Sequence, residues 1–144
     1  METQSDEQNL EDIRLVGRAL SLSLTVSDIK RSLSWYCDVL GFAMRRNYER
    51  EGRLRAVSLT SGEVRILITQ DEGTRAANRV KGEGFSIKIT STQNIDLLAE
   101  AIKSRGGTLE NEPIDLRWGQ RVFRLRDPDG YKFAISSEVS ERNV

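Results

Sequence analysis

Histidine is absent from this sequence: none of its 144 residues is one. Mechanisms that need an imidazole base, a Ser-His-Asp triad, a Cys-His pair or a histidine-bound metal are therefore excluded. Cysteine occurs once, at Cys37, so the chain can form neither an internal disulfide nor a Cys-x-x-Cys zinc site. Without a histidine to lower its pKa, we interpret Cys37 as a packing thiol rather than a nucleophile. The glycine-rich fingerprints of dinucleotide sites and phosphate loops are missing as well.

An excess of charge of one sign and long apolar runs are lacking too. Lysine and arginine together number 22, as do aspartate and glutamate, so the formal net charge is zero. A neutral chain has no general attraction to polyanions, which argues against nucleic-acid binding. No apolar run approaches the roughly 20 residues that span a bilayer, and the acidic start METQSDEQNLEDIR is unlike a secretory signal. We therefore expect no membrane partner and a cytoplasmic location.

The first half of the chain has the pattern of one strand, one helix and three more strands. Apolar and small polar residues alternate from Leu20 to Val26, with Leu20, Leu22, Leu24 and Val26 facing the core, as in a half-buried strand. Asp28 can cap a helix that Gly41 ends. The apolar positions of this helix are Ile29, Leu33, Tyr36 and Leu40, and the strands that follow are predicted over 42–48, 53–61 and 64–69.

The same order recurs about 64 residues further on, which indicates an internal repeat. After a polar connector come a strand over 85–90, a helix that Asn94 caps, and strands over 108–113, 118–126 and 131–137. The last two strands meet at Asp127-Pro128-Asp129-Gly130, a turn sequence. The repeat predicts two βαβββ modules, at 18–70 and 83–138, within one domain over 18–138. An N-terminal arm over 1–17 and a C-terminal tail over 139–144 flank that domain.

Two segments carry a resemblance to a known family. The segment LTVSDIKRSLSWYCDVLGF, from Leu24 to Phe42, resembles the opening strand and helix of the vicinal oxygen chelate superfamily. That superfamily contains glyoxalase I, extradiol dioxygenases, fosfomycin-resistance enzymes and bleomycin resistance proteins. The segment FRLRDPDGYKF, from Phe123 to Phe133, is similar to its closing hairpin, so the match covers residues 19–138. The resemblance implies an α+β fold in which two tandem βαβββ modules form an open, cup-shaped mixed sheet with the ligand inside, commonly as a homodimer.

The metal ligands of the superfamily are missing from this chain. Metal-using relatives carry a histidine on the first strand and a glutamate on the last strand of the modules. Alignment on the two motifs puts Ser21 and Ala134 at two of these positions, and the others fall near Leu67 and at Gly84 or Ser86. None offers an imidazole or a carboxylate. We therefore predict no metal, no cofactor and no catalytic residue, although oxygen ligands for Mg²⁺ or Ca²⁺ elsewhere stay an open alternative.

Metal-free members of the superfamily, the bleomycin-resistance-like proteins, bind a ligand in the cup without converting it. Trp118-Gly119-Gln120-Arg121 is similar to the Trp-Gly-x-Arg stretch of that branch. Tryptophan offers a flat stacking surface, and arginine can clamp an anionic or carbonyl group. The alternative interpretation is that Trp118 covers the edge of the core and that Arg121 is solvated.

Strand parity places further polar and small side chains on the faces opposite the core. Lys88 is the sharpest candidate among them, because a charge amid β-branched residues is costly unless it meets water, an acid or a ligand. The alternative is that these faces are simply solvated. The candidate ligand-binding residues are Ser21, Ser23, Ser86, Lys88, Trp118, Arg121, Lys132 and Ala134, with Ser136 in the same row as the last two.

Other charged groups have simpler interpretations. Asp127 and Asp129 are explained by their turn. Arg45, Arg46, Arg50, Arg53 and Arg55 are interleaved with Glu49 and Glu51, so a solvated hairpin is favoured over an anion site. Trp35 is expected to cover a sheet edge or a subunit contact.

Two functions therefore remain. The first is a metal-free protein that sequesters an organic ligand, for instance an antibiotic, in the cup. The alternative is an enzyme, a glyoxalase-like lyase or isomerase or a dioxygenase relative, with a non-standard site that uses groups such as Lys88, Arg121 or a tyrosine. We expect a homodimer, because open sheets leave unpaired edges and the residues from Leu10 to Val16 can lie on a partner.

Overall fold

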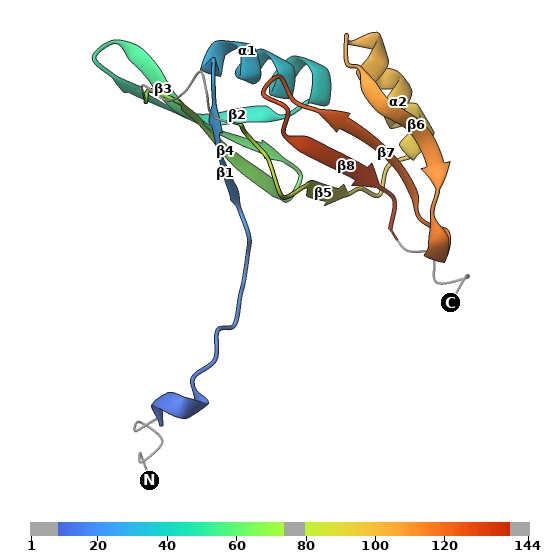
Figure 1. The fold of residues 1–144 in the computed structure, drawn as a ribbon, viewed down its shortest axis with the longest axis horizontal. Helices are drawn as coiled ribbons and strands as arrows, with labels where there is room; N and C mark the ends of the chain where they lie inside the picture. Colours follow the sequence, from blue (N-terminus) through green and yellow to red (C-terminus); the bar gives the residue numbers. More distant parts are fainter. Residues whose placement is uncertain (1–8, 74–79, 139–144) are drawn as a thin grey trace.

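The chain folds into two four-stranded sheets, each accompanied by one helix (Figure 1). The computed structural model describes residues 9–73 and 80–138. The α+β class and the two tandem βαβββ modules predicted from the sequence are confirmed. No helix of these residues is long and apolar enough to cross a membrane.

The first module has the strand order β1-β4-β3-β2. β1 pairs parallel with β4, and the other two pairings are antiparallel. Asp28 caps α1, since its side chain accepts hydrogen bonds from the backbone N–H groups of Lys30 and Arg31. The helix continues as a π-helix over Trp35–Leu40 and ends at Gly41, whose φ of 95° suits a residue without Cβ. The elements are β1 (Leu22–Val26), α1 (Ile29–Ser34), β2 (Ala43–Arg50), β3 (Arg53–Ser61) and β4 (Val64–Gln70).

The second module repeats this topology, with the strand order β5-β8-β7-β6. Asn94 caps α2, because its side-chain oxygen accepts a hydrogen bond from Leu97 N at 3.0 Å. The strand expected from residue 118 begins only at Arg121, because residues Arg117–Gly119 form a 3₁₀ turn. The elements are β5 (Ile87–Thr90), α2 (Ile95–Ser104), β6 (Leu109–Asp115), β7 (Arg121–Arg126) and β8 (Lys132–Ser136).

Both helices lie on the same side of the sheets (Figure 1), and the apolar core lies between them and the strands. Alternate residues of β1, β3 and β4 and of β5, β7 and β8 point into this core. They include Leu24, Val57, Leu59, Ile66 and Ile68 in the first module and Ile87, Phe123, Leu125, Phe133 and Ile135 in the second. We call the opposite side of each sheet its helix-free face.

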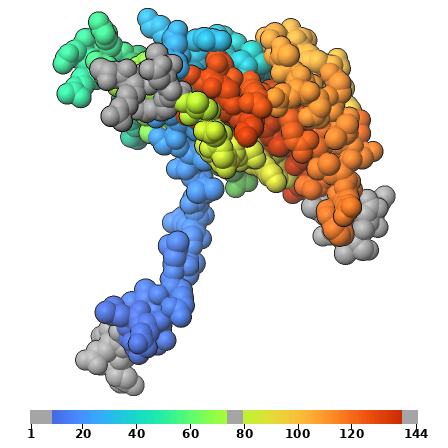
Figure 2. Space-filling view, in the orientation of Figure 1, coloured from blue at the N-terminus to red at the C-terminus, as the bar shows by residue number. Residues whose placement is uncertain are grey.

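Residues 10–20, which belong to the N-terminal arm and to the segment that leads into β1, extend away from both sheets (Figures 1 and 2). Leu10, Leu15, Val16 and Leu20 are each more than four-fifths exposed. The expectation that Leu20 faces the core is wrong, because β1 begins only at Leu22. The arm therefore presents apolar side chains that are left largely exposed to solvent.

Candidate functional site

A hollow of about 590 Å³ lies on the helix-free face of the first sheet. Three arginines, Arg45, Arg46 and Arg65, line it, and we call it the arginine hollow. Its other side chains are small, apolar or hydroxyl-bearing: Ser21, Tyr48, Ser58, Thr60 and Leu67 contribute to it. Among the described residues no carboxylate lines the hollow, so its surface there carries positive charge and hydroxyl groups.

A β-bulge brings two consecutive arginines to this face. Met44 pairs with Leu59 and Arg46 pairs with Ser58, so Arg45 is the extra residue between two ladder positions. A bulge interrupts the strict alternation of side chains along a strand. Both Arg45 and Arg46 consequently line the hollow, and Arg45 Nε donates a hydrogen bond to Thr60 Oγ1 at 3.1 Å.

The alternation of side chains along β4 explains why Arg65 also lines the hollow. Ile66 and Ile68 point into the core, so Arg65 and Leu67 point to the helix-free face. The ladder places Arg65 opposite Thr60, and Leu67 between Ser23 and Ser58. Among the residues that the structure describes, no ion pair involves Arg45, Arg46 or Arg65.

The helix-free face of the second sheet carries the other candidate residues. Ala134 pairs with Lys88 on one side and with Arg124 on the other, so the three form one row across the sheet. Lys132 and Ser136 lie on the same strand at alternate positions, and Ser86 precedes β5 with the parity of Lys88. Lys88, Arg124 and Ser86 are exposed, whereas Ala134 is buried between its neighbours. The structure thus places Ser21 and Ser23 on one sheet and Ser86, Lys88, Lys132 and Ala134 on the other.

Arg121 does not join these residues. Its guanidinium binds Asp96 of α2 through Nε at 2.9 Å and Asp115 of β6 through Nη1 at 2.9 Å. The side chain therefore lies on the helix-bearing side, because Arg121 shares the parity of the core residues Phe123 and Leu125. The two carboxylates raise the pKa of Arg121, and the expectation that it faces into the cup is not met.

Trp118 does not line the arginine hollow either. It lies in the turn between β6 and β7, is 63% exposed and has a φ of 68°, in the left-handed region that favours glycine. The sequence indicated a tryptophan available for stacking, but it did not indicate this turn.

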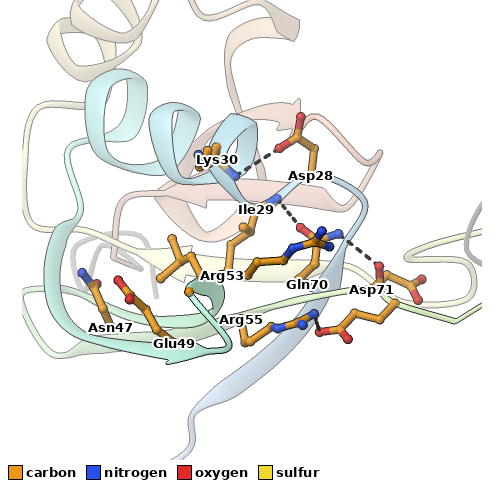
Figure 3. Close-up of a pocket in the computed structure, with 12 residues that line it drawn as sticks. Asp28, Ile29, Lys30, Asn47, Glu49, Arg53, Arg55, Gln70 and Asp71 are labelled. Carbon is orange, nitrogen blue, oxygen red and sulfur yellow. Dashed lines mark hydrogen bonds and ion pairs between the residues drawn. The ribbon is translucent and has the colours of Figure 1, made fainter.

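A larger cavity, of about 850 Å³, lies beside the N-terminus of α1 and the β2–β3 hairpin (Figure 3). Its charges are mixed, and most of its carboxylates already bind groups of the protein. Asp28 caps α1, Asp71 pairs with Lys81 at 3.1 Å and Glu72 pairs with Arg55. Three of the four carboxylates that line the cavity are therefore already engaged by groups of the protein.

The residues at the superfamily's metal positions do not fit a metal ion. Ser21 and Leu67 line a hollow that holds three arginines, whose positive charge repels a cation. Ala134 lies between Lys88 and Arg124. Within residues 9–73 and 80–138, no group of three or more histidine, cysteine, aspartate or glutamate side chains is placed to hold a metal.

Three other interpretations from the sequence can be compared with the structure. Cys37 is a free, half-buried thiol whose pKa is raised, chiefly by burial, so the nucleophilic thiolate is disfavoured. Trp35 packs edge-on against Tyr36, with ring centroids 4.9 Å apart, and its ring also lies 6.1 Å from that of Phe133. Asp127 does form the expected turn, accepting hydrogen bonds from Asp129 N and Tyr131 N.

Comparisons with known proteins agree with this architecture. The family model described as "Glyoxalase/Bleomycin resistance protein/Dioxygenase superfamily" matches residues 18–135. The probable lactoylglutathione lyase of Synechocystis sp. is 27% identical over 130 residues, which cover 86% of this chain and 98% of that protein. The bleomycin resistance protein of Geobacillus stearothermophilus is 33% identical over 129 residues, which cover 81% of this chain and 94% of that protein.

Solved structures show the same fold. A member of the same superfamily from Sphaerobacter thermophilus is 25% identical, with a TM-score of 0.67 over 84% of this chain and 98% of its own. TioX from Micromonospora sp. has a TM-score of 0.68 at 17% identity, covering 83% of this chain and 98% of its own. The likeness to TioX shows the fold alone.

Proposed function

Because the chain belongs to the glyoxalase/bleomycin resistance protein/dioxygenase superfamily, we propose that it binds and sequesters a small organic molecule in the arginine hollow, without metal-dependent chemistry. The observation that carries the proposal is the hollow itself. It includes Ser21 and Leu67, which the family resemblance puts at or near two metal-ligand positions, and three arginines share the hollow with them. The volume and the mixture of apolar, hydroxyl and cationic side chains suit a ligand of drug size.

A second candidate function is a lyase, because the relative from Synechocystis and several others carry the name lactoylglutathione lyase. The residues at the metal positions, which include Ser21 and Ala134, argue against a metal-dependent lyase reaction. A lyase of this chain needs another source of acid and base groups, and the hydroxyl of Tyr48, which lines the hollow, is a candidate.

One experiment separates the two candidates. The purified chain is dialysed against Zn²⁺, Ni²⁺, Mn²⁺ or Fe²⁺, its metal content is measured, and thioester formation from methylglyoxal and glutathione is followed. We expect substoichiometric metal and no turnover. Turnover, with or without stoichiometric metal, would refute sequestration as the function.

A screen of small organic molecules by thermal unfolding tests the binding itself. A ligand at 100 times its Kd stabilises the folded state by about 2.7 kcal/mol, which gives a measurable rise in Tm. Ser58→Trp fills the hollow and removes this rise, whereas Ser104→Trp, on the exposed end of α2, keeps it. Equal responses of the two variants would place binding elsewhere.

The proposed assembly is a homodimer in which the N-terminal arm of each copy lies on the other. Its apolar side chains are exposed in the single chain, and burying them against a second copy removes that surface from water. The strand β2 is exposed at all eight of its residues and lies at a sheet edge, so it also gains from being covered.

A further inference from the structure

Several cations of this neutral chain lie on the two helix-free faces. The two helix-free faces carry six cations that form no ion pair among the described residues. These are Arg45, Arg46 and Arg65 on the first sheet and Lys88, Arg124 and Lys132 on the second.

The arginine hollow concentrates this charge most strongly. Three guanidinium groups share one concave surface, and no carboxylate of residues 9–73 or 80–138 lines it. Like charges that share a hollow repel one another, and the repulsion grows when a ligand displaces water. A neutral ligand would leave that repulsion in place and a cationic ligand would increase it, whereas an anion removes it.

We infer that the ligand of the arginine hollow is an organic anion whose carboxylate or phosphate group is held by Arg45, Arg46 and Arg65. The inference rests on the proposed function, since it names the chemical class of the molecule that the hollow takes. Guanidinium groups match these anions because they offer two parallel N–H donors.

The surroundings of the arginines divide the hollow into two parts. Thr60 accepts a hydrogen bond from Arg45 Nε, which fixes the direction of that side chain before an anion arrives. Leu67 lies between Ser23 and Ser58 in the ladder and offers apolar contact. The ligand therefore combines an anionic group with an apolar part.

Two matched probes test the sign of the charge. 1-Anilinonaphthalene-8-sulfonate carries one negative charge, and N-phenyl-1-naphthylamine is the same ring system without it. We expect fluorescence titration to show the sulfonate binding at least about fivefold more tightly, and less tightly in high salt. Benzoate and phenyl phosphate should displace it and benzyl alcohol should not, and their ranking tells carboxylate from phosphate preference.

Single substitutions test which arginines bind the sulfonate probe. Arg65→Gln and Arg46→Gln should each weaken binding of the sulfonate about tenfold, which is the loss of one charge-assisted contact, and leave the uncharged probe unchanged. Arg31→Gln removes the same charge from exposed α1 on the other side of the sheet and should change neither probe.

The outcomes distinguish the two proposals. If both probes bind equally in the parent and in Arg65→Gln, and Ser58→Trp abolishes both, the hollow is a ligand site but not an anion site. If Ser58→Trp affects neither probe, the proposed function fails as well. If deletion of residues 1–16 creates the sulfonate site, the acidic arm of the chain occupies the hollow, and the inference is overturned.

Discussion

The hydroxyl of Tyr36 donates a hydrogen bond to Asp127 Oδ2 at 2.7 Å, and both residues are buried. This bond joins the helix of the first module to the β7–β8 turn of the second. A second bridge lies nearby, where Ser27 N donates to Asp129 Oδ1 at 3.1 Å. The acidic turn therefore connects the two modules in addition to reversing the chain.

Tyr36→Phe should lower the free energy of unfolding by about 1–3 kcal/mol, because it leaves a buried carboxylate without one of its donors. Urea denaturation measures the change. Tyr48→Phe is the matched control, since Tyr48 is 46% exposed and its hydroxyl forms no hydrogen bond with another described residue. Equal losses for the two variants would contradict the role assigned to Tyr36.

The same bond predicts the response to alkali. Burial, followed by the nearby Asp127 carboxylate, raises the pKa of Tyr36 above its ordinary value of 10.0. A raised pKa means that the stabilisation is complete below about pH 10 and is lost as the pH rises further, because the unfolded tyrosine ionises first. The parent should therefore lose more stability than Tyr36→Phe between about pH 9 and pH 11. The pKa of Tyr131 is also raised by burial, so part of the decrease in stability with rising pH should remain in both proteins.

The sequence predicted the module order well, because each strand and helix has its own periodicity and its own cap or turn. It predicted the site less well. Arg121 has the parity of the core residues Phe123 and Leu125, which implies that it faces the helices. Arg65 has the opposite parity to the core residues Ile66 and Ile68, which implies that it faces the helix-free side. The parity of these core residues is therefore a sequence signal for the direction of both arginines.

Other features of the site could not be found from the sequence. Strict alternation places Arg45 and Arg46 on opposite faces, and only the bulge brings them together. Bulges depend on how two strands fit across a ladder, which no local pattern reveals. The connection from Asp127 to Tyr36 spans 91 positions and depends on how the modules pack.

Trp118 provides a test of backbone strain. Its φ of 68° is costly for a residue with a Cβ, so Trp118→Gly should be more stable than Trp118→Ala by about 1 kcal/mol. Thermal or urea unfolding of the two variants measures this difference. Because Trp118 does not line the hollow, both variants should bind the sulfonate probe within about twofold of the parent. A large loss of affinity in both would instead restore Trp118 as a ligand contact.

Ala134→Glu tests whether one restored carboxylate recreates a metal position. We expect no gain in bound Zn²⁺ or Ni²⁺ by elemental analysis, because Lys88 and Arg124 flank the new side chain and pair with it. Stoichiometric metal in this variant would show that the loss of a single ligand, rather than the cationic surroundings, prevents metal binding.

Deletion of residues 1–16 tests the assembly. If the arm lies on a second copy, sedimentation or light scattering should give a dimer for the full chain at tens of micromolar and a smaller dimer fraction for the truncated chain. Stability of the truncated monomer should change little, because the exposed Leu10, Leu15 and Val16 are not part of the core.

Leu15→Ser with Val16→Ser is a milder variant that keeps the chain length, and it should also weaken the dimer, because less apolar surface is buried on association. A full chain that sediments at one chain mass would exclude the proposed dimer, and a truncated chain with an unchanged dimer fraction would show that the arm is not part of its interface.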